Sequence, residues 1–65
     1  SQASERKDEL VNTIKEKMGE IRDAKDGVKA QQVKELFTQY DVTLKELEKL
    51  SLKDLIELTS KIKKV

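Results

Sequence analysis

The chain contains no cysteine, no histidine, no proline and no tryptophan among its 65 residues. Without cysteine there can be no disulfide framework, and without cysteine or histidine a structural zinc site lacks its usual ligands. Nucleophilic catalysis usually pairs a hydroxyl or thiol with a histidine base, so the same absences disfavour an enzyme. We therefore expect no catalytic residue, no bound metal and no cofactor.

Long apolar runs are also absent. No segment approaches the roughly 18 consecutive apolar residues of a membrane-spanning helix, and no signal peptide is visible. Charged residues make up 42% of the chain, but the net charge is only +1 because the two signs are interspersed. This balance argues against a strong overall attraction to nucleic acid or to anionic membranes. The expectation is a soluble, cytoplasmic protein without membrane contact.

The length of the chain limits it to one domain with a small core. Residues 1–4 are polar and are expected to be a frayed lead, followed by a single helical domain over residues 5–65. Since disulfides and zinc are excluded, additional stability would have to come from self-association or from a partner.

Two stretches of apolar residues recur at helical spacing. The first predicts a helix over about residues 5–24, capped by Ser4; it contains Leu10, Val11, Ile14, Met18 and Ile21. The second predicts a helix over about residues 29–40; it contains Ala30, Val33, Leu36, Phe37 and Tyr40. On one continuous helix the two stripes would point about 90° apart. A break at Asp26-Gly27 realigns them, with Gly27 supplying a positive φ; a single bent helix over 5–40 is the alternative.

An eight-residue pattern then occurs twice in succession, at residues 43–50 and 51–58. Thr43 and Glu46 have the spacing of a capping box, and Ser51 and Asp54 repeat it with a shorter acid. On one straight helix the leucines of this region would spread over about 200° of the surface, too wide for one buried face. We therefore predict two helices, near 44–50 and 52–63, and an all-α bundle of three to four short helices. The alternative is one continuous helix with an exposed Ser51.

Apolar residues around this repeat are the candidate contacts for a partner. They are Leu36, Phe37, Tyr40, Leu44 and Leu47. Aromatic and leucine side chains on a helix face either pack in the core or anchor a partner. A calcium loop around Gly27 fails, because Arg22, Ala24 and Val33 would occupy ligand positions.

The C-terminal lysines Lys61, Lys63 and Lys64 provide a second candidate site. They are suited to phosphate contacts with nucleic acid, although cations also favour a helix C-terminus. A helix-turn-helix interpretation is weak, because Asp54 and Glu57 on the recognition face would repel phosphates.

Residues 31–47 resemble the end of the oligomerisation region of bacterial histone-like nucleoid-structuring proteins, where a similar helix precedes a turn and a short leucine-bearing helix. The glycine common in that family's turn is Asp41 here, and the family's aromatic, glycine-rich DNA-binding tail is absent. The resemblance implies self-association.

The sequence as a whole favours a non-catalytic, regulatory helical module for protein–protein interaction or self-association. The expected partner is another protein or a second copy of the chain. A small nucleic-acid-associated regulator using the C-terminal lysines is the alternative, and an excised or idealised scaffold domain is a third interpretation.

Overall fold

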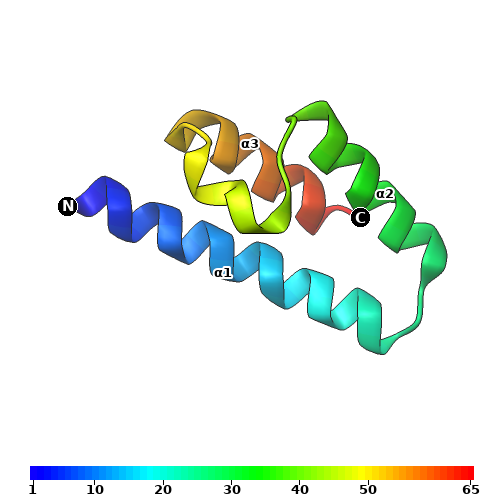
Figure 1. The fold of residues 1–65 in the computed structure, drawn as a ribbon. Helices are drawn as coiled ribbons and strands as arrows, with labels where there is room; N and C mark the ends of the chain where they lie inside the picture. The colour runs from blue at the N-terminus through cyan, green and yellow to red at the C-terminus, as the bar shows by residue number, and fades with distance from the viewer.

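The computed structural model of the protein covers residues 1–65 and consists of helices, without strands. The elements are α1 (Gln2–Asp23), α2 (Gly27–Gln39), the 3-10 helix η1 (Leu44–Lys49) and α3 (Leu52–Lys63). The long α1 lies along one side, and the other three elements pack against it (Figure 1). The predicted small all-α bundle is confirmed. None of the helices combines the length and the apolar character needed to cross a membrane.

Helix α1 begins at Gln2 rather than near residue 5. The hydroxyl of Ser1 accepts a hydrogen bond from the Ser4 amide at 3.2 Å and so caps the helix. Both serines are suitable caps, and Gln2 and Ala3 are good helix formers, so the helix extends to the earlier one. The residues expected to be a frayed lead therefore form the cap and first turn of α1.

The turn between α1 and α2 falls at the predicted place but uses a different residue. Lys25 takes the positive φ, at 53°, while Gly27 is the first residue of α2 and has no positive φ. The Lys25 amide donates to the Arg22 carbonyl and the Asp26 amide to the Ile21 carbonyl, which is the Schellman pattern. Asp26 then caps α2 by accepting from the Lys29 amide at 3.0 Å. The prediction that Gly27 supplies the positive φ is wrong.

The end of α2 repeats the same geometry. Asp41 has a φ of 53°, and the Val42 amide donates to the Phe37 carbonyl at 3.2 Å.

The chain then enters η1 through the predicted capping box. The Glu46 carboxylate accepts from the Thr43 amide at 3.1 Å and from the Thr43 hydroxyl at 3.0 Å. These bonds hold the pKa of Glu46 below its usual 4.5: the Thr43 hydroxyl contributes most, then the Thr43 amide and the charge of Lys49.

The predicted break before α3 is confirmed. Leu50 and Ser51 both have extended backbone, with ψ of 148° and 157°, so residues 44–63 cannot be one helix. The Ser51 hydroxyl accepts from the Asp54 amide at 3.2 Å and caps α3. The 3-10 geometry of η1 was not foreseen, since capping residues mark where a helix begins but do not set its type.

Nine buried apolar residues form one core. Helix α1 contributes Leu10, Val11, Ile14 and Ile21, α2 contributes Val33, η1 contributes Leu47, and α3 contributes Leu55, Leu58 and Ile62. Both halves of the eight-residue repeat therefore turn leucines inward. The one buried polar residue, Thr59, donates to the Leu55 carbonyl at 2.6 Å, so its hydroxyl is satisfied.

Candidate protein-binding groove

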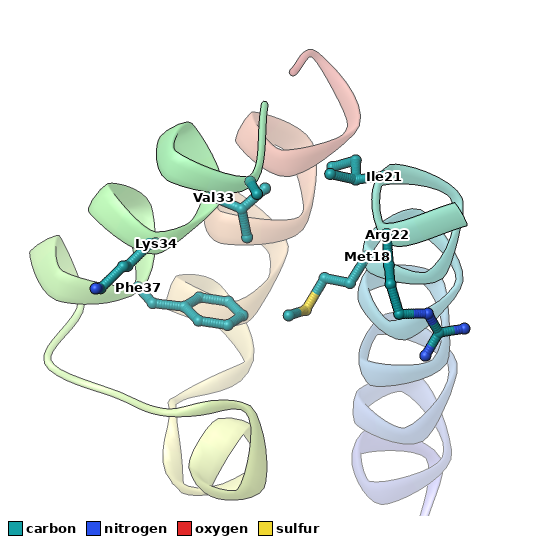
Figure 2. Close-up of a pocket in the computed structure, with 7 residues that line it drawn as sticks. Met18, Ile21, Arg22, Val33, Lys34 and Phe37 are labelled. Carbon is teal, nitrogen blue, oxygen red and sulfur yellow. The ribbon is translucent and has the colours of Figure 1, made fainter. Parts of the chain in front are cut away.

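A groove of about 430 Å³ lies between the C-terminal half of α1 and helix α2 (Figure 2). Its walls are Met18, Ile21, Arg22, Ala30, Val33, Lys34 and Phe37. Five of these seven side chains are apolar. The volume lies in the range of about 300–1,000 Å³ that is typical of small-molecule sites, although this groove is open along its length rather than enclosed.

Helical periodicity explains why these residues share the groove. On α1, Met18, Ile21 and Arg22 follow the spacing i, i+3, i+4, which places them on one face. On α2, Ala30, Val33 and Phe37 follow i, i+3, i+7. Figure 2 shows the Phe37 ring and the Met18 side chain reaching toward one another across the gap between the helices.

The two charged residues of the groove are both cations. Arg22 belongs to α1 and Lys34 to α2, so each wall carries one positive charge. The Arg22 Nε donates to Asp23 Oδ1 at 3.4 Å, and both side chains of this pair are largely exposed. Lys34 takes part in none of the ion pairs of the structure, which are Arg6–Glu9, Arg22–Asp23 and Lys49–Glu46. Figure 2 shows the head groups of both side chains directed away from the gap, so the surface inside the groove is almost entirely apolar.

Of the residues predicted to contact a partner, Phe37 alone lines the groove. Leu36, Tyr40 and Leu44 are half-buried and pack against the core. Leu47 is only 1% exposed and lies inside the bundle, so its side chain cannot reach a partner in this structure. Its hydrophobic-staple position at the start of η1 explains the burial, because that position packs back against the chain before the helix.

Tyr40 connects α2 to α3. Its hydroxyl donates to Glu57 Oε2 at 3.4 Å, and Lys61 Nζ lies 5.0 Å from the centroid of its ring. The interaction with the Tyr40 hydroxyl raises the pKa of Lys61 above its usual 10.5, which keeps this lysine charged. Glu57 and Lys61 form no ion pair with each other, since both interact with Tyr40.

The C-terminal lysines do not form one cluster. Lys61 lies over Tyr40 on the side of α2, whereas Lys63 and Lys64 border a shallow depression together with Arg6 and the exposed Ile56. Arg6 in turn donates to Glu9 at 3.4 Å. The structure thus adds Arg6 to the predicted basic end and separates Lys61 from it.

The polar side chains of the chain form no metal-ligating cluster. No group of three or more histidine, cysteine, aspartate or glutamate residues is placed to hold a metal ion. The groove contains no serine, threonine or carboxylate beside its apolar walls. What it offers chemically is apolar surface.

Four of the groove residues belong to the apolar stripes of the two predicted helices: Met18, Ile21, Ala30 and Val33. Ile21 and Val33 are indeed buried, whereas Met18 is half-buried and Ala30 exposed. No local signal in the sequence marks the groove, because the small share of α2 that the core uses is a result of tertiary packing, in which Val33 is the one buried residue of this helix.

Comparisons with known proteins give no further assignment: no protein family, curated protein or solved structure matches the chain significantly. The resemblance of residues 31–47 to nucleoid-structuring proteins therefore remains a similarity of sequence pattern alone.

Proposed function

We propose that this protein is a non-catalytic helical interaction module that binds an apolar segment of another protein in the groove between α1 and α2. The observation that supports this proposal is the groove itself, in which five of the seven lining residues have apolar side chains. Removal of such surface from water drives most protein–protein association. Phenylalanine and methionine, which face each other in the groove, are enriched in interfaces.

A groove-blocking variant tests the proposal. Proteins captured with the wild-type chain would be identified and purified, and their affinities for two variants measured by calorimetry. Ala30→Glu places a charged side chain in the groove, and we expect it to weaken binding at least about tenfold, equivalent to about 1.4 kcal/mol. Val28→Glu adds the same charge to α2 outside the groove, at a residue that is 73% exposed, and should bind as the wild type does.

Two results would contradict the proposal. Partners that bind Ala30→Glu as tightly as wild type would show that the groove is not their site. If sedimentation equilibrium found that the wild type is a dimer and that Ala30→Glu is a monomer, the occupant of the groove would be a second copy of the chain rather than another protein.

Nucleic-acid binding is the second candidate function, favoured by the placement of Arg6 beside Lys63 and Lys64. The acids among these cations, including Glu9 bonded to Arg6, weaken it. Fluorescence anisotropy with a labelled DNA duplex tests it, because phosphate contacts give affinity that falls steeply with salt. An absence of binding at low salt would end this alternative.

A further inference from the structure

Helix α2 is attached to the rest of the bundle by few buried contacts. We infer that α2 undocks as one unit, with residues 24–26 and 40–43 as hinges, while α1, η1 and α3 stay packed together. This movement is a conformational property of the fold and does not depend on what the groove binds. Because α2 is one wall of the groove, its undocking turns the groove into an open apolar face of α1.

The distribution of the core separates α2 from the other elements. Eight of the nine buried apolar residues belong to α1, η1 and α3, and Val33 is the one that α2 contributes. Helix α1 packs directly on both α3 and η1, so these three elements remain joined when α2 leaves. Elements with few buried apolar contacts open at a lower free energy than the whole domain unfolds.

The other contacts of α2 are half-buried or exposed. Leu36 and Phe37 are half-buried and pack against the core. At the end of α2, the Tyr40 hydroxyl donates to Glu57 Oε2 at 3.4 Å, and Lys61 Nζ lies 5.0 Å from the centroid of the ring. Polar contacts at exposed sites contribute little, because water competes for the same groups. None of the three ion pairs joins α2 to another element.

Both ends of α2 have the geometry of hinges. Short connections separate it from α1 at residues 24–26 and from η1 at residues 40–43. Hinges are residues at the ends of elements that absorb changes of φ and ψ. Lys25 and Asp41, one in each connection, have a φ of 53°, which is unfavourable for a residue with a Cβ. Undocking releases both residues to negative φ, and this favours the opened state.

The short length of α2 makes its undocking observable. The helix has 13 residues, near the length at which isolated helices are marginal in water. Once it leaves the bundle, α2 therefore loses its helical hydrogen bonds, and its amides exchange with solvent together.

Hydrogen exchange of the full chain in low concentrations of urea, followed by NMR, tests this inference. The urea dependence of an opening reaction grows with the surface that it exposes. The hydrogen-bonded amides of α2 should share one urea dependence, smaller than that of the core amides of α1 and α3, and should exchange at least about tenfold faster. Dependences near zero that differ between residues would mean fraying, and dependences equal to those of the core would mean global unfolding. Either result would overturn the inference.

Two core variants give a matched comparison. Val33→Ala removes an apolar contact that is lost both on undocking and on global unfolding, so it should accelerate exchange in all three α-helices by a similar factor, about fourfold or more. Leu10 is 6% exposed and lies beside Ile56 and Thr59 of α3, away from α2. Because this residue stays buried in the opened state, Leu10→Val should accelerate exchange about fourfold in α1 and α3 and leave α2 unchanged.

Acceleration of α2 by Leu10→Val to the same extent as α1 and α3 would mean that α2 opens only when the whole bundle unfolds. Circular dichroism would establish that both variants are folded, and the urea dependences of the wild type decide the question if either variant is not.

Discussion

At the scale of single residues, two residues other than glycine adopt a backbone conformation that favours glycine. Lys25 and Asp41 both have a φ of 53°, and each ends a helix. A left-handed conformation costs a residue with a Cβ about 1–2 kcal/mol, which glycine avoids at the expense of greater freedom when unfolded. The chain therefore accepts strain at both turns, although Gly27 lies two residues from the first.

The first prediction places glycine at residue 25, where φ is positive, and removes it from residue 27, where φ is not. Lys25→Gly should raise the free energy of unfolding by about 0.5–1 kcal/mol, because relief of the left-handed strain exceeds the added freedom of the unfolded chain. Gly27→Ala should also stabilise, by about 0.4–1 kcal/mol, since no atom lies within 4 Å of the added Cβ. Urea unfolding followed by circular dichroism measures both changes. A loss of stability in Gly27→Ala would mean that Gly27, not Lys25, carries the positive φ.

The second prediction concerns the capping box. Because the pKa of Glu46 is lower in the folded chain than its usual 4.5, the ionised carboxylate stabilises the fold above that pH. This contribution is lost as the pH falls from about 4.5 through the lower folded pKa. Glu46→Gln should therefore reduce the loss of stability on acidification, measured as urea midpoints between pH 7 and pH 3. Glu48→Gln removes the same charge two residues away from the box and should retain the wild-type pH dependence.

At the scale of the elements, Ser51 separates η1 from α3. Its cap depends on a hydrogen bond from the Asp54 amide at 3.2 Å, and its own backbone is extended. The third prediction is that Ser51→Ala lowers the free energy of unfolding by about 1 kcal/mol, as for other lost caps. Ser60→Ala, within the exposed part of α3, should be neutral or slightly stabilising. If Ser51→Ala also stabilised the protein, residue 51 would lie inside a continuous helix, where alanine has a higher helix propensity than serine.

Most of these elements could be predicted from sequence because their signals are local. The capping pairs at Thr43 and Ser51 act within four residues, and the apolar stripes of α1 and α2 fix which faces turn inward. The start of α1 could not be fixed, since Ser1 and Ser4 are equally good caps. The choice of Lys25 over Gly27 also could not be predicted, because it depends on where α1 ends to within one or two residues.

The groove depends on relations between elements that no local signal contains. Periodicity placed Met18 and Ala30 on apolar faces, but their exposure depends on how far α1 and α2 stand apart. That distance is a result of tertiary packing, in which α3 contacts both helices and contributes three buried apolar residues. Leu47 shows the opposite difference: the sequence predicts it as a contact residue for a partner, whereas in the structure it is buried in the core.

At the scale of the whole molecule, the core is unevenly distributed. Three of the four buried apolar residues of α1, Leu10, Val11 and Ile14, lie near the middle of the helix, and only Ile21 lies closer to its C-terminal end. Helix α2 adds a single buried residue, Val33. Helix α2 is therefore held against the rest of the molecule mainly by Val33 and by its half-buried neighbours Leu36, Phe37 and Tyr40.

The fourth prediction follows from this distribution. Elements with few buried apolar contacts open at lower free energy than the core, so their amides exchange with solvent through local rather than global unfolding. Amides in the middle of α2 should exchange faster than those around Leu58 in α3, which is 0% exposed. Hydrogen exchange followed by NMR measures the two rates in one sample. Equal protection of both helices would mean that α2 is as firmly packed as α3, although Val33 is its one buried residue.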